Sequence, residues 1–136
     1  MFHDTGFIVE YDNNEPIGAK IAKNYLRSTG YDRADIYIIE NIIIATRLEE
    51  KPKNIYEQIV KDADMDNLGR DDFFEKSDKL KQEIEHIKNI SLDNKKWDAS
   101  NFTLISTHTY YTKTQHKERD KKRQENMQKL KEVLEK

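Results

Sequence analysis

The sequence predicts an all-α protein, and two observations carry the prediction. Only four glycines and two prolines occur in 136 residues, too few for the turns of a many-stranded β protein. Several stretches also place apolar side chains at helical spacing. The apolar fraction is 35% and the charged fraction 37%, against about 45–50% and 25% in soluble domains. We therefore expect one domain with a modest core and a solvated part.

The first predicted helix covers residues 15–29. Asn14 is a suitable N-cap, Glu15 puts an acid in the first turn, and Pro16 stands where its missing N–H costs nothing. Gly30 marks the end of the helix. The apolar face that we expect to turn toward the core contains Ile17, Ile21, Tyr25 and Leu26.

Propensity and pattern disagree over the segment 36–46. Six isoleucines in nine residues favour a strand. Glu40 and Asn41, however, break the alternation that a half-buried strand needs. The apolar positions that follow helical spacing are Ile36, Ile39, Ile42 and Ile43. We therefore predict a buried helix.

Four more helices are expected after a loop over 47–54. The first is short, and the side chains that we expect it to bury are Ile55, Ile59, Val60 and Ala63. The next, over 71–89 with Asp71 as cap, presents Phe73, Leu80, Ile84 and Ile87. Another surrounds Trp97, Phe102, Leu104 and Ile105. The segment 113–136 has as its large aliphatic side chains Met127, Leu130, Val133 and Leu134, a narrow stripe that can dock one helix face but encloses no core.

Charge is unevenly distributed along the chain. Residues 113–136 hold nine basic and five acidic residues, a local charge of +4, and residues 1–112 carry −6. We accordingly divide the chain into a helical core over 1–112 and a charged C-terminal helix over 113–136. Acids interleaved with the basic residues of this helix are typical of a solvated face.

The composition also limits the partners and the compartment. The net charge of −2 gives no general attraction to nucleic acid or to a membrane surface, so we expect neither partner. No apolar run approaches the ~18 residues of a membrane span, and no signal peptide is recognisable. The absence of cysteine fits a reducing compartment. We expect a cytoplasmic protein.

Three polar clusters are candidates for chemistry. They are His3-Asp4 at the start, Asp62-Ala63-Asp64 in mid-chain, and His108 in the segment His-Thr-Tyr-Tyr-Thr-Lys-Thr. Imidazole and carboxylate groups from separate helices can hold one divalent cation. The residue types alone do not distinguish Mn, Fe, Ni, Mg and Zn.

In order and spacing, these clusters resemble the HD superfamily of metal-dependent phosphohydrolases. The resemblance rests on His3-Asp4-Thr5-Gly6-Phe7, on Glu15 within Asn-Asn-Glu-Pro-Ile-Gly, and on Asp62-Ala-Asp-Met-Asp-Asn-Leu-Gly. The segment 108–114 before a charged helix is similar to that of bacterial HD-domain hydrolases. The resemblance covers most of the chain. It implies an HD-domain-like helical bundle that hydrolyses a nucleotide or another small phosphate ester with a bound divalent metal ion.

The resemblance also implies the metal ligands. In that family the ion is held by a histidine on a preceding helix, by the paired His and Asp, and by a later Asp that usually follows Ala. The corresponding residues here are His3, Asp4 and Asp64, with Asp62 as the second choice for the last position. Asp4 and Asp64 are also the expected catalytic carboxylates.

Two departures from the family pattern change what we expect. The chain begins two residues before His3, so the helix carrying the first histidine is absent and the bundle is expected to be truncated at its N-terminus. Asn14 and Thr46 stand where binuclear relatives have histidine. We therefore expect a single metal ion.

Residues near the motifs are candidates to bind the substrate. For this role we name Glu15, Arg70, His108 and Lys113, and Lys61 as a further cation for the phosphates. The alternative for the cations is a solvated surface charge. For His108 it is a histidine that supports the core.

The missing helices would expose an apolar groove along Phe2, Phe7, Ile8 and the isoleucine helix. Such a surface is a liability in a monomer, so we expect a homo-oligomer, unless a longer native chain supplies the helices. Two alternatives to the enzyme stay open. One is a degenerate, non-catalytic HD module that binds a nucleotide or a partner protein, and the other is a helical scaffold in which the motif is a relic.

Overall fold

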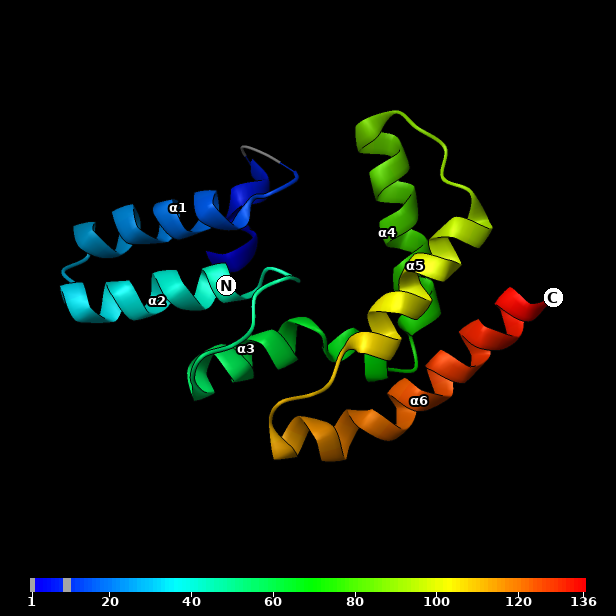
Figure 1. Cartoon of the computed structure of the whole chain (residues 1–136). Helices are drawn as coiled ribbons and strands as arrows, with labels where there is room; N and C mark the ends of the chain where they lie inside the picture. The colour runs from blue at the N-terminus through cyan, green and yellow to red at the C-terminus, as the bar shows by residue number, and fades with distance from the viewer. Residues whose placement is uncertain (1, 9–10) are drawn as a thin grey trace. The chain divides into compact units, whose positions relative to one another are not determined.

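The computed structural model describes residues 2–8 and 11–136, and it confirms the all-α prediction (Figure 1). Those residues form two 3₁₀ helices and six α-helices, without a strand. None of these helices is long and apolar enough to cross a membrane. The chain divides into two compact units, Met1–Asp64 and Met65–Lys136. The boundary expected at residue 112 falls inside the second unit, because the C-terminal helix packs on the helix before it and on residues 66–69.

The first unit contains the 3₁₀ helix η1 (Phe2–Ile8) and the helices α1 (Glu15–Ser28), α2 (Arg33–Ala45) and α3 (Ile55–Asp64). Helices α1 and α2 lie side by side as a hairpin, and η1 packs on α1 (Figure 1). The isoleucine-rich segment is helical, so spacing prevailed over β propensity. The side chains of Phe7 and Ile8, expected to line an apolar groove, lie outside the described part.

The hairpin is held by small residues that the apolar pattern did not single out. Its buried core consists of Ala19, Ala22, Leu26, Ile36 and Ile43. Tyr25 was expected in this core but is 56% exposed, because alanines on α1 let the two helices approach closely and shift the contact face. Helix α2 is likewise buried along one face only, since Ile38 on its other side is 41% exposed.

Helix α3 reverses the predicted orientation. The expected core residues Ile55 and Ile59 are 53% and 51% exposed. The buried side chains of this helix are instead polar, namely Glu57, Lys61 and Asp62. A physical reason is that the surrounding loop presents backbone groups that need partners.

Two of these buried side chains form hydrogen bonds with backbone groups in and next to the loop over 47–54. Glu57 accepts a hydrogen bond from the backbone N–H of Lys53 at 2.7 Å, and the Glu57 N–H donates to Asn54 Oδ1 at 3.0 Å. The Lys61 ammonium donates to the carbonyl oxygens of Ala45, Arg47 and Glu50 at 3.1, 2.5 and 2.6 Å. Burial lowers the pKa of Lys61. The polar face of α3 therefore fixes the α2–α3 connection.

The second unit contains the 3₁₀ helix η2 (Asp66–Gly69) and the helices α4 (Phe73–Lys88), α5 (Asn94–Thr107) and α6 (Lys113–Glu135). The N-cap of α4 is Asp72, and the expected cap Asp71 pairs with Lys122 at 2.7 Å. Likewise, Asn14 precedes α1 without a side-chain cap hydrogen bond; its amide donates to the Tyr11 carbonyl.

The core of the second unit joins η2, α4, α5 and α6 through Leu68, Phe73, Ile105 and Leu130. Farther along α4, Leu80 and Ile87 are 45% and 50% exposed, so only the start of the predicted face is buried. On α6, Leu130 is buried and Val133 is 47% exposed.

Helix α6 and η2 are in close contact at Gly69. A Cβ there would come within 2.5 Å of the Arg119 carbonyl oxygen, which excludes any larger residue without a backbone shift. Asn126 on the same helix is 1% exposed and donates to the carbonyls of Leu68 and Arg70, each at 3.0 Å. Side-chain and backbone contacts thus tie η2 to α6.

Candidate functional site

The structure brings together the three side chains proposed as metal ligands. The imidazole Nε2 of His3 lies 3.1 Å from Asp4 Oδ2 and 3.4 Å from Asp64 Oδ1. His3 and Asp4 belong to η1, and Asp64 is the last residue of α3. All three lie in the first unit. Two segments some sixty residues apart in sequence therefore meet at this cluster.

Two glycines hold η1 against the start of α1. A Cβ on Gly6 would overlap the Asn14 carbonyl oxygen, and one on Gly18 would lie 3.0 Å from the Phe2 oxygen and 3.3 Å from the His3 oxygen. Within η1, the Thr5 hydroxyl donates to the Phe2 carbonyl at 2.7 Å. The absence of a side chain at both glycines therefore lets the backbone of His3 sit directly on α1.

The spacing of the two α3 carboxylates explains why they differ. Residues two apart on an α-helix point about 200° apart, so Asp62 and Asp64 face opposite sides. Asp62 is 2% exposed, whereas the Asp64 side chain is 29% exposed and lies beside His3. Asp64 therefore lies on the side of α3 that meets His3.

The electrostatics of the cluster are mixed. Burial raises the pKa of the Asp64 carboxyl above its ordinary value, the nearby His3 opposes that shift, and the Asp4 carboxylate adds to it. A positive charge placed between the carboxylates would relieve both effects. The cluster therefore favours a bound cation between its carboxylates.

The donor set fits a divalent metal ion in its chemistry, since one imidazole and two carboxylates suit several first-row ions and Mg²⁺. Two ligands at right angles on an ion with bonds of about 2.1 Å lie about 3 Å apart. The distances from His3 Nε2 to each carboxylate are close to that value. Among residues 2–8 and 11–136, however, no three His, Cys, Asp or Glu side chains are arranged as a formed cation site.

The expected substrate-binding residues lie in both units. Glu15 begins α1 in the first unit, while Arg70, His108 and Lys113 belong to the second. Arg70 pairs with Asp66 at 3.3 Å and Asp72 at 3.1 Å. Lys113 is an exposed residue at the start of α6.

His108 and Lys61 make their contacts with neighbouring groups of the protein. His108 is the C-cap of α5, where its backbone N–H donates to the Leu104 carbonyl, and its ring packs edge-on against Tyr110 with ring centroids 5.0 Å apart. Tyr110 is 3% exposed and donates its hydroxyl to the Met65 carbonyl. The three N–H groups of the Lys61 ammonium meet three carbonyls, which leaves none for a substrate phosphate.

Comparison of the chain with protein-family models, with curated proteins and with solved structures finds no match.

Proposed function

We propose that the chain is a metal-dependent phosphohydrolase of the HD type, acting on a nucleotide or another small phosphate ester. The observation that supports this proposal is the approach of His3 Nε2 to Asp4 Oδ2 and Asp64 Oδ1, at 3.1 and 3.4 Å. These are the residues that the motif order singled out. They would hold one divalent ion.

The chemistry divides between the ion and the chain. A bound divalent ion supplies a water of lowered pKa and offsets charge on the phosphoryl oxygens. The Asp64 carboxylate can accept a proton from a water held beside it, because the side chain is partly exposed and burial raises the pKa of its carboxyl above the ordinary value. His3 orients both carboxylates through its short contacts to them.

The proposal is tested with the purified full chain, stripped of metal and then supplied with Mn²⁺, Ni²⁺ or Mg²⁺. Metal binding is measured by calorimetry and hydrolysis with a chromogenic phosphate monoester. We expect stoichiometric binding and turnover, and a loss of about a hundredfold or more in rate for His3→Ala and Asp64→Ala.

Two exposed residues outside the cluster provide matched controls. His86→Ala and Asp78→Asn remove the same residue types from α4 and should leave binding and turnover unchanged. If no ion binds, or if His3→Ala turns over as fast as the parent, the chain is not a hydrolase of this type.

One observation favours the second function, a non-catalytic HD module that binds a nucleotide or a partner protein. No formed three-ligand arrangement exists in the described part of the chain, so the cluster could persist as a histidine shared by two carboxylates. Nucleotide binding without metal and without turnover, measured in the same titrations, would identify this case.

We also propose that the protein is cytoplasmic and acts as a homo-oligomer. The first unit exposes large apolar side chains on α2, α3 and the loop between them, including Tyr37 at 66%, Leu48 at 64% and Tyr56 at 59%. A second copy of the chain is the simplest cover for such a surface. Light scattering at micromolar concentration should give a mass above 16.2 kDa; a monodisperse monomer refutes the proposal.

A further inference from the structure

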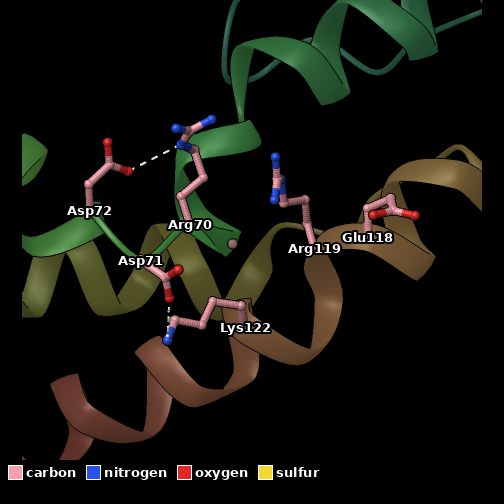
Figure 2. A pocket seen from close by; sticks show the side chains of 7 residues that line it. Arg70, Asp71, Asp72, Glu118, Arg119 and Lys122 are labelled. Carbon is pink, nitrogen blue, oxygen red and sulfur yellow. Dashed lines mark hydrogen bonds and ion pairs between the residues drawn. The ribbon is translucent and has the colours of Figure 1, made fainter.

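The second unit contains a cavity of about 470 Å³ between the η2–α4 junction and α6. Figure 2 shows its lining, which comprises Gly69, Arg70, Asp71, Asp72, Glu118, Arg119 and Lys122. No aromatic or aliphatic side chain is among these residues. The cavity is therefore suited to a small polar ligand and not to a nucleobase or an apolar group.

One carboxylate holds two guanidinium groups at this cavity. Asp66 accepts a hydrogen bond from Arg119 Nε at 2.6 Å and one from Arg70 Nη1 at 3.3 Å. Gln115 donates to the same carboxylate at 2.6 Å. Burial alone would raise the pKa of Asp66, but these hydrogen bonds outweigh it and lower the pKa below its ordinary value. Asp66 thus stays ionised and keeps two like charges close together.

The ion pairs leave donors for a further acceptor. A guanidinium group has five N–H donors. Arg119 meets Asp66 through Nε, and Arg70 meets Asp72 and Asp66 through Nε and Nη1. In the described residues, the Nη groups of Arg119 and the Nη2 group of Arg70 donate to no protein group. Figure 2 shows both guanidinium groups extending from their backbones in the same direction.

The protein backbone gives the cavity a fixed shape. The contact between Gly69 and the backbone of Arg119 places the two arginine-bearing segments at van der Waals distance. The Asn126 amide also donates to the carbonyls of Leu68 and Arg70. The arginines are therefore mounted on segments that cannot separate easily, which lowers the entropic cost of binding.

We infer that this cavity binds a dianionic phosphate, either inorganic phosphate or the phosphate of a small monoester, between Arg70 and Arg119. Planar guanidinium groups bind phosphate oxygens through paired, charge-assisted hydrogen bonds. Lys122 adds a third positive charge, although Asp71 pairs with it at 2.7 Å. This site goes beyond the proposed hydrolase, because none of its residues belongs to the His3 cluster, although the sequence analysis named Arg70 as a candidate to bind the hydrolase's substrate.

The carboxylates around the cavity limit the expected affinity for phosphate. Three cations and three acids line it, so long-range attraction is weak and the affinity must come from short contacts. Asp71 is 93% exposed, so solvent screens its charge. Removing a lining acid that is not needed to hold an arginine should therefore strengthen phosphate binding.

The test is an NMR titration of the isotope-labelled full chain with inorganic phosphate, glycerol 3-phosphate and dimethyl phosphate at pH 8. We expect saturable shifts at the Gly69 amide and at the Nε–H signals of Arg70 and Arg119. The two dianions should bind, and the monoanionic diester should bind about tenfold more weakly or not at all. Tighter binding of the diester would point to a nucleic-acid backbone and overturn the inference.

Variants separate binding from folding. Arg119→Gln should weaken phosphate binding about tenfold or more, as expected for loss of charged hydrogen bonds, and Lys79→Gln, on an exposed ion pair of α4, should not. Glu118→Gln should strengthen binding about twofold to fivefold by removing a nearby negative charge, an effect that loss of structure cannot produce.

The outcome is independent of the hydrolase. His3→Ala should leave the phosphate titration unchanged even where it abolishes turnover. Unsaturable shifts spread over all basic residues, or equal affinities for the parent and Arg119→Gln, would overturn the inference.

Discussion

Replacing Asn126 tests how the second unit is held together. This residue is 1% exposed, and its amide donates to the Leu68 and Arg70 carbonyls at 3.0 Å each. Asn126→Ala removes this donor from the Leu68 oxygen and leaves the Arg70 oxygen with only the Phe73 N–H, which lies 3.4 Å away. A buried unsatisfied carbonyl costs about 1–3 kcal/mol. Since the Leu68 bond is buried and the Arg70 bond partly so, we assign about 2 and 1 kcal/mol, or about 3 kcal/mol in total.

Trp97 provides the assay. It is the single tryptophan of the chain, it lies on α5, and its indole donates to Ser77 on α4 at 2.9 Å, so its fluorescence reports on the second unit. With a slope of about 1 kcal/mol/M in urea for a unit of this size, Asn126→Ala should lower the midpoint by about 3 M or leave the unit unfolded in buffer.

Two companion variants make the result specific. Asn126→Asp keeps the size of the side chain but places a carboxylate opposite two carbonyl oxygens, so it should cost more than the alanine variant. Gln128→Ala removes an exposed amide two positions along the same helix and should cost below about 0.5 kcal/mol. If Asn126→Ala and Gln128→Ala have the same midpoint, the contact between η2 and α6 does not depend on this amide.

Three further predictions concern other contacts. Lys61→Met removes the donor to three carbonyls of the α2–α3 connection and should destabilise the first unit by about 3 kcal/mol. The loss should appear as faster hydrogen exchange of the backbone amides in α2 and α3. Unchanged protection of these amides would contradict the role assigned to Lys61. Gly69→Ala forces a Cβ to within 2.5 Å of the Arg119 oxygen and should lower the free energy of unfolding of the second unit by about 1–3 kcal/mol, measured by Trp97 fluorescence. An unchanged free energy of unfolding would show that η2 and α6 separate freely. Because the folded-state pKa of Asp66 is lowered, its ionised form contributes stability above the unfolded pKa of about 4, and that stability is lost as pH falls through the folded pKa. The difference in urea midpoint between the parent and Asp66→Asn should therefore be constant near neutrality and become smaller below about pH 4. A difference that grows in acid would contradict the stabilising role of the ionised Asp66 carboxylate.

Several parts of the candidate site followed from the sequence. The order of His3-Asp4 and Asp62-Ala63-Asp64 indicated that distant segments would meet, and the preference for Asp64 came from the resemblance, in which the last ligand usually follows Ala. The glycines that seat η1 on α1 were visible as residues of the motif. That Gly6 and Gly18 act by allowing backbone contact could be known only once both segments were in place.

The sites missed were polar contacts between segments far apart in sequence. Nothing local distinguishes Asn126 from the other amides of α6, or Asp66 from its acidic neighbours, because their roles depend on a carbonyl, an amide and a guanidinium group 49 to 58 residues away. The same reason explains α3, whose polar face turns inward to meet a loop that presents bare backbone groups.

The sequence by itself determined that the described chain is helical and indicated which stretches form its α-helices, because apolar spacing, glycines and prolines act over a few residues. It did not determine which face of each helix is buried. Small residues on α1, backbone carbonyls near α3 and a glycine contact on α6 decided those faces, since close packing and hydrogen-bond satisfaction are properties of segments that meet only after the chain has folded.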